Sequence, residues 1–341
     1  MKTKLLLTLL PLLSLHANSY RDTTSAQAPS THAHSNPDWQ ISVDALFWRA
    51  YENRLQYATK PSDVDETSDF TKGHLIGPHF KWHTGFREKF AYAPQDCKWD
   101  LYFQWTQITN RATGRVIAPG NTVDPGDGFG FYPVWHLAPD AMATDFALTG
   151  REIWKLTTNV VDGVWGYHFD WAPWFRLTTH VGARGAFLSQ HAVITYTGGI
   201  FPDGQETTLL HNNFRGVGPL VQLDPEFYLT KNHNLSIYFL GAAALLLGRT
   251  VLKEKAQTYF AFAHPGVHKS LFKARWVVDA LAGIKWRIPF FHHHYALTFK
   301  GGWEFHDFFG QFLLPSPTLN LLKGNHNLLL FGWFASAQFE F

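Results

Sequence analysis

The sequence predicts an all-β protein, a single antiparallel transmembrane β-barrel of about ten strands behind an export signal. Apolar and polar residues alternate over segments as long as a membrane-spanning strand. No apolar run beyond the N-terminus is long enough for a transmembrane helix. The composition is rich in aromatic residues (16%) and poor in charged ones (16%), where about 25% charged residues is typical of soluble domains. Such a composition excludes intrinsic disorder for most of the chain.

The charge balance and the cysteine content exclude further classes. Lys and Arg number 29 and Asp and Glu number 27, a net charge of +2. This balance predicts no nucleic-acid partner. The single cysteine, Cys97, excludes a disulfide framework and a cysteine-rich zinc site.

The N-terminus has the pattern of a secretory signal peptide. Lys2 and Lys4 precede an apolar stretch at residues 5–15, and Ala17 supplies a small residue for cleavage. We therefore expect a signal peptide over residues 1–17, a disordered linker over 18–37 that is rich in Ser, Thr, Ala and His, and the barrel over 38–341. The longest later apolar run, residues 239–247, has about half of the ~20 residues that a membrane helix needs.

The alternation favours membrane strands over a soluble sandwich. Between Trp276 and Trp286 every second residue is apolar, and the residues between them include Asp279 and Lys285. Such segments reach the 9–11 residues of a tilted membrane strand, whereas soluble strands average about 5–6. Aromatic residues also lie at both ends of the apolar faces, as in the aromatic girdles of lipid-facing strands.

The elements follow in order along the chain. We expect strands at residues 39–50, 78–93, 97–110, 151–170, 174–197, 212–229, 234–249, 271–289, 294–310 and 326–341. Short connections at 94–96, 171–173, 230–233 and 290–293 alternate with long ones at 51–77, 111–150, 198–211, 250–270 and 311–325. Short periplasmic turns and long outer loops are the rule for these barrels, and an even number of strands places both termini in the periplasm.

The longest predicted loop, residues 111–150, leaves two points open. A hairpin within it would raise the number of strands to twelve. Because it contains four prolines and several glycines, it is also the best candidate to fold inward as a constriction or outward as a surface epitope. The last strand ends on Phe341 after alternating aromatic residues, a pattern typical of the signal that the outer-membrane insertion machinery recognises. That machinery and the lipid bilayer of the bacterial outer membrane are the expected partners.

Several segments resemble the Legionella-type outer membrane protein family, which includes MOMP-like barrels of chlamydia-related bacteria. The matching stretches are residues 43–50, 99–102, 154–162, 180–186, 212–219 and 301–304. The resemblance implies a pore-forming, surface-abundant protein of the outer membrane. Chlamydial major porins are cross-linked through several cysteines, so the lone Cys97 departs from their pattern.

The alternation also predicts which charged residues face the barrel interior. The basic ones are Lys81, Lys98, Lys155, Arg176, Arg184, Arg275, Lys285, Arg287 and Lys300, and the acidic ones are Asp44, Asp100, Asp224, Asp279, Glu304 and Glu340. In an open lumen, nine bases against six acids favour anions. In a narrow barrel the same charges can pair across the lumen and close it.

The function expected from these features is a porin-like channel for passive diffusion of small hydrophilic solutes, with a mild anion preference. The alternative is a non-conducting surface or structural barrel or an adhesin; an outer-membrane hydrolase is a third candidate. Catalytic motifs such as Gly-x-Ser-x-Gly and His-Glu-x-x-His are absent. His306 and Asp307 are adjacent and therefore point to opposite faces of a strand. We expect neither an enzyme nor a cofactor or metal, and assembly into oligomers is compatible with the sequence.

Overall fold

The computed structural model describes residues 39–53, 55–61, 73–94, 97–118, 130–135, 147–199, 201–257, 267–290, 295–312 and 326–341. The expected signal peptide and linker lie outside these residues. The described part of the chain holds no helix of membrane-spanning length and apolarity.

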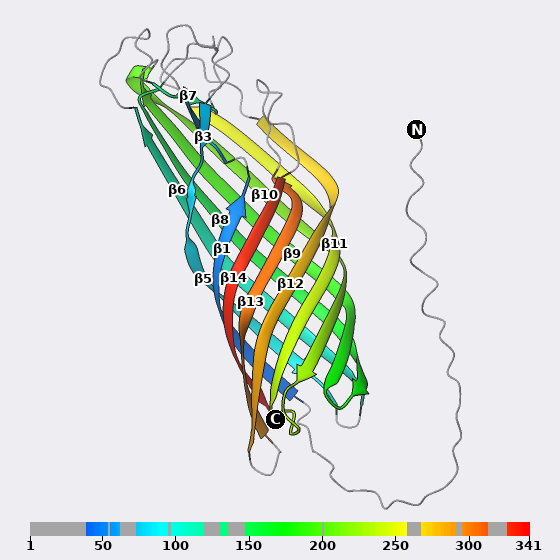
Figure 1. The fold of residues 1–341 in the computed structure, drawn as a ribbon. Coiled ribbons are helices and arrows are strands. Elements are labelled where there is room, and N and C mark those ends of the chain that lie inside the picture. The colour runs from blue at the N-terminus through cyan, green and yellow to red at the C-terminus, as the bar shows by residue number, and fades with distance from the viewer. Residues whose placement is uncertain are drawn as a thin grey trace, which may run out of the picture. The chain divides into compact units, whose positions relative to one another are not determined.

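Ten antiparallel strands form a closed ring (Figure 1). They are β1 (Trp39–Glu52), β5 (Trp82–Tyr92), β6 (Trp99–Ile117), β8 (Thr149–Ala172), β9 (Phe175–Gly198), β10 (Phe201–Tyr228), β11 (Leu235–Gln257), β12 (Val267–Phe290), β13 (Tyr295–Phe312) and β14 (His326–Glu340). Each strand pairs with the next, and β1 pairs with β14 to close the ring. Closure leaves no unpaired edge around the central part of the ring, whereas the part of β12 before Val277 has no partner among the described residues of β13. The prediction of a single antiparallel barrel of about ten strands is confirmed.

Short elements complete the outer end, where the longer connections lie. Strand β4 (His79–Phe80) extends the pairing of β6. Strands β2 (Ala58–Pro61), β3 (Gly73–Ile76) and β7 (Tyr132–Pro133) form a separate three-stranded sheet. Since β7 pairs with β2, the described residues of 111–150 add no hairpin to the ring, which keeps ten strands rather than twelve.

The strands extend further outward than the alternation predicts. The expected loop at residues 198–211 is wrong, because β9 and β10 remain paired as far as Thr197 and Gln205. Strands β6 and β11 also continue beyond their predicted ends, to Ile117 and Gln257. In these outer portions most exposed residues are polar, although Ile117 is 58% exposed, so the strands lack the regular apolar outward pattern on which the prediction depends.

The outward face of the central strand segments is apolar, as predicted. On β12, Trp276, Ile284 and Trp286 are each more than half exposed, whereas Val277 between them is fully buried. The last strand behaves in the same way, since Trp333 and Phe339 are exposed and Phe334 is buried. A surface of this kind is stable only against lipid, because it is too large and too continuous for water.

We expect a charge on this surface to destabilise the barrel strongly. Ala280→Arg places a guanidinium in the middle of the apolar face of β12 and should lower the free energy of unfolding by about 2–4 kcal/mol. The matched change Thr113→Arg, on the exposed polar outer part of β6, should cost about 0–1 kcal/mol. Reversible urea unfolding from lipid vesicles measures both. Equal losses for the two variants would show that the lipid-facing surface is misassigned.

Candidate functional site in the barrel interior

A chain of buried ion pairs crosses the barrel interior. On β5, Arg87 donates from Nη2 to Glu304 Oε2 of β13 at 2.8 Å and from Nη1 to Asp44 Oδ2 of β1 at 3.2 Å. Trp48 donates its indole N–H to the other oxygen of Glu304 at 2.8 Å. Strands β1 and β14 stand between β5 and β13. The Arg87–Glu304 pair therefore spans the interior rather than two neighbouring strands.

A second guanidinium extends the chain to the other side of the ring. Arg184 of β9 donates from Nε and Nη2 to both carboxylate oxygens of Asp162, at 2.7 and 2.8 Å. Its Nη1 donates to Asp279 of β12. Two strands, β10 and β11, separate β9 from β12. Arg184 thus bridges across the interior in the same way as Arg87.

His306 joins the two halves. Its Nδ1 lies 2.9 Å from Asp279 Oδ1, and its Nε2 lies 3.6 Å from Glu304 Oε2. The result is a continuous interior belt of seven residues, ordered Asp44, Arg87, Glu304, His306, Asp279, Arg184 and Asp162. Asp307 faces the opposite side of β13 and accepts a hydrogen bond from Asn327 instead. The prediction that His306 and Asp307 do not form a pair is confirmed.

The charged side chains of the belt are largely buried. The side chains of Asp44, Arg87, Glu304, Arg184, Asp162 and Asp279 retain only 1–10% of their accessible surface. Charged groups that line an aqueous channel would be solvated along the channel, whereas these six are nearly buried, and His306 between them keeps 17% of its side-chain surface. A further cross-lumen contact fills the same region, where Tyr102 of β6 donates its hydroxyl to Gln222 of β10 at 2.8 Å.

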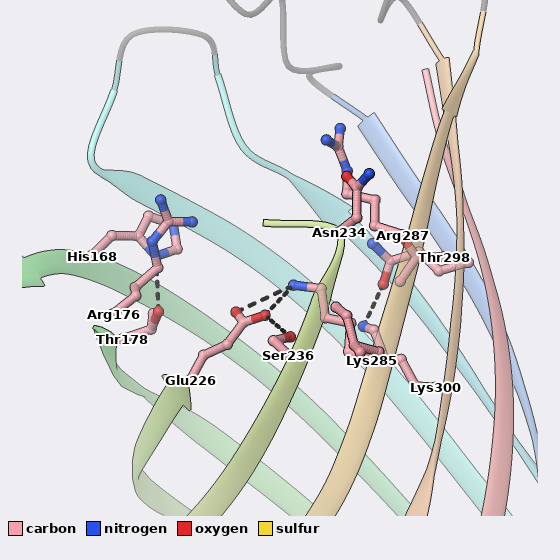
Figure 2. A network of polar contacts seen from close by, with 12 residues as sticks. His168, Arg176, Thr178, Glu226, Asn234, Ser236, Lys285, Arg287, Thr298 and Lys300 are labelled. Atoms are coloured by element: carbon pink, nitrogen blue, oxygen red, sulfur yellow. Dashed lines mark hydrogen bonds and ion pairs between the residues drawn. The ribbon is translucent and has the colours of Figure 1, made fainter. Parts of the chain in front are cut away.

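A more open polar network lies between the belt and the periplasmic turns (Figure 2). Lys285 donates to both oxygens of Glu226 at 2.9 and 3.2 Å, and Ser236 donates to Oε1 at 2.5 Å. Arg287 donates to Glu340 at 2.9 Å. Lys285 and Arg287 keep 24% and 21% of their side-chain surface, so this end of the interior is partly solvated.

His180 lies between two acids in the same part of the interior. Its two ring nitrogens lie 3.2 Å from Asp100 and 3.1 Å from Asp224. His168 approaches the same Asp100 at 3.6 Å and pairs with the hydroxyl of Thr178 at 2.9 Å. Both histidines therefore face an acid inside the barrel.

An apolar layer lies in the outer half of the interior, together with buried polar side chains such as Glu52, Gln190 and Glu254. The layer is formed by fully buried side chains that include Leu46, Trp48, Trp154, Leu156, Leu188, Ile194, Phe214 and Leu330. Long apolar side chains on facing strands fill a barrel of this width, because its radius is comparable to their length.

Loop segments cover this apolar layer at the outer mouth. Tyr57, Phe131 and Trp135 are 0–3% exposed. The Tyr196 hydroxyl donates to the Tyr57 carbonyl at 2.5 Å, and Thr208 donates to the Trp135 carbonyl at 3.1 Å. The predicted loop at residues 111–150 could fold inward or outward, and its residues 130–135 fold inward.

The structure brings most of the predicted interior charges together. Arg184, Asp279, Glu304 and Asp44 belong to the interior belt, and Asp100, Asp224, Lys285, Arg287, Lys300 and Glu340 belong to the periplasmic network. Arg275 is buried higher up, where it donates to the Thr250 hydroxyl at 2.8 Å. Arg176 pairs with Asp170 near the periplasmic rim, where both side chains are more than a third exposed.

Three predicted interior residues lie elsewhere. Lys155 is exposed on the outer face of β8, because its neighbours Trp154 and Leu156 occupy the interior. Lys155 was predicted to face the interior on the assumption that apolar residues point outward along the whole of β8. Lys81 and Lys98 are exposed residues outside the strands, directly before β5 and β6.

Arg87 is the main interior residue that the sequence analysis missed. It shares the phase of the predicted Lys81, six residues earlier, so the alternation within 78–93 contains the signal. Asp162 was missed as well, although it has the phase of the interior residue Trp154. Within the described residues, no three His, Cys, Asp or Glu side chains are placed to hold a metal ion.

Comparisons with solved structures return outer-membrane barrels. The outer membrane protease OmpT from Escherichia coli is 8% identical, with 90% of this chain and 97% of that chain covered and a TM-score of 0.42. A Pseudomonas aeruginosa FadL homologue is 9% identical, with 90% and 91% covered and a TM-score of 0.27. The monoaromatic hydrocarbon channel TodX, as a deletion mutant, is 6% identical, with 90% and 91% covered and a TM-score of 0.26. Likenesses this distant carry no argument about function.

The comparison with protein families gives a match over most of the chain. Residues 31–341 match the family described as Legionella pneumophila major outer membrane protein precursor. No curated protein matches the sequence. The family places the barrel in the bacterial outer membrane, in agreement with its apolar outward face. The chain belongs to the Legionella major outer membrane protein family.

Proposed function

We propose that this protein is a structural barrel of the outer membrane whose lumen is closed to solutes. The observation that carries the proposal is the interior belt, whose two guanidiniums each pair with carboxylates across the ring. The apolar layer and the loop segments around Tyr57 and Trp135 form a second closure in series. A hydrated solute would have to displace both.

The energetics of buried charge explain why such a belt resists opening. Removing one partner of a buried ion pair leaves the other charge desolvated and uncompensated, which costs several kcal/mol. The belt contains four carboxylates, two guanidiniums and His306. A passing ion would have to replace these contacts one after another.

A second candidate is passive diffusion of small solutes with a mild anion preference. The partly solvated Lys285 and Arg287 favour it, because they offer cationic groups to an anion that enters from the periplasmic end. Their positive charge is matched, however, by Glu226 and Glu340 at 2.9 Å. The closed barrel is therefore the better supported function.

Single-channel recording in planar bilayers tests the closed lumen. The refolded protein should give no stepwise conductance in 1 M KCl, while resistance to protease and a heat-modifiable gel mobility verify that it is folded and inserted. Regular conductance steps would overturn the proposal. Reversal potentials across a KCl gradient would then measure the anion preference of the second candidate.

The interior belt should also stabilise the barrel. Arg87→Met leaves Asp44 and Glu304 buried without their cation, and we expect it to lower the free energy of unfolding by about 3–5 kcal/mol. The matched control is Arg49→Met on β1, which removes a cation with no ion pair among the described residues and should change stability by less than about 0.5 kcal/mol. Urea unfolding from vesicles compares the two. A small loss for Arg87→Met would mean that the belt contributes little.

A further inference from the structure

The outer portions of six adjacent strands carry basic side chains on the outward face. Eight exposed Lys and Arg residues occupy these positions on β6, β8, β10 and β11, and they are Arg111, Arg115, Arg151, Lys155, Arg215, Arg249, Lys253 and Lys255. Histidines add to them on β9, β10 and β12. No Asp or Glu occurs among the described outward residues beyond the apolar face of these six strands. We call this surface the basic band.

Strand register places the members of the band side by side. Arg111 is opposite Lys155, Lys155 is opposite His191, and His191 is opposite His211. His211 is opposite Lys253, which in turn is opposite His268. The row therefore crosses β6, β8, β9, β10, β11 and β12 without interruption. The rings of His191 and His211 are 4.3 Å apart between centroids.

Two arginines mark the lower edge of the band. Arg215 and Arg249 are opposite each other on β10 and β11. Each lies two positions farther out than a strongly exposed apolar residue of its strand, Val217 on β10 and Leu247 on β11, which are 61% and 48% exposed. With a strand tilt of about 45°, two residues advance roughly 5 Å along the barrel axis. The arginines thus lie at the depth where lipid head groups begin.

Like charges placed directly opposite one another destabilise a sheet unless a counter-charge covers them. Among the described residues, no acidic side chain forms an ion pair with Arg215, Lys155 or Lys253. Between the edge arginines and the upper row lie hydroxyl and amide groups, among them Thr157 and the hydrogen-bonded pair Ser189 and Asn213, at 2.7 Å. A ligand that matches this surface has acyl chains below, phosphate at the edge and sugar hydroxyls above.

We infer that the basic band binds the phosphorylated glycolipid of the outer leaflet of the outer membrane. Arginine forks bind phosphate oxygens in pairs, and each basic residue near a charged lipid surface strengthens attachment. The polar row would donate and accept hydrogen bonds with the sugar. This binding does not depend on whether the lumen conducts, because every residue of the band faces outward.

Binding of purified bisphosphorylated lipid A to the full-length protein in neutral detergent micelles tests the inference. The band variant Arg215→Gln/Arg249→Gln removes two charges at the edge and should weaken binding about 25-fold, or roughly fivefold for each charge. The control variant Lys98→Gln/Lys231→Gln removes two exposed charges from periplasmic turns and should bind like the unmodified protein. Lipid A from which both phosphates have been removed should bind all three proteins weakly and equally.

Two results would overturn the inference. Equal weakening in the band and control variants would mean that net charge alone attracts the lipid. Equal affinity of the unmodified protein for lipid A with and without phosphate would mean that only the acyl chains bind. Because the substituted residues are exposed, both variants should keep the heat-modifiable gel mobility of the folded barrel. Conductance recorded on the same samples remains a separate measurement of the closed lumen.

Discussion

A closed ring of ten strands directs every second side chain into the barrel interior. This interior is narrow enough for side chains on distant strands to reach one another. Eight-stranded barrels are filled by their side chains, whereas 16–18 strands leave an aqueous channel. Ten strands lie near the narrow end of that range. Long polar side chains can therefore reach across, as Tyr102 does to Gln222 and Gln190 does to Glu52. A charge placed in this interior is desolvated and therefore needs a partner, which a distant strand can supply. The narrow width thus explains why the charges of the interior belt occur as pairs.

The surrounding solvent divides each strand into two parts with opposite patterns. Where the strand crosses the lipid, its apolar residues point outward, as Trp165 does on β8 at 47% exposure. Farther out on the same strand the barrel exterior meets head groups and water, and the apolar residues point inward, as Trp154 does. Tryptophan is thus on opposite faces of one continuous strand. The same reversal allows the apolar layer to close the outer mouth while the outside remains polar.

This reversal explains which features the sequence could predict. Where the strands cross the lipid, their positions and faces follow from the period of two. Trp276, Ile284 and Trp286 are exposed on the outer face, as expected. The predicted strands stop too close to the membrane at their outer ends, and Lys155 was assigned to the wrong face. Both errors arise because the apolar residues change from the outward to the inward face where the lipid ends. The presence of Arg184, Asp279 and Glu304 inside the barrel was predictable. Their pairing was not, because it depends on the stagger between strands, which alternation does not encode.

The same reversal also separates the charges of the outer half. Arg151 points outward and Glu152 inward, and Glu254 lies buried between the exposed Lys253 and Lys255. Along the chain these charges alternate and nearly cancel, so the net charge of +2 indicates no preference for anions. In the folded barrel Glu152 and Glu254 are enclosed, whereas Arg151, Lys253 and Lys255 remain outside. A balanced composition therefore does not predict a neutral surface for a barrel, because its two faces meet different surroundings. The potential that a lipid phosphate meets is set by the outward residues near it, since charges beyond about 8 Å are screened at physiological salt.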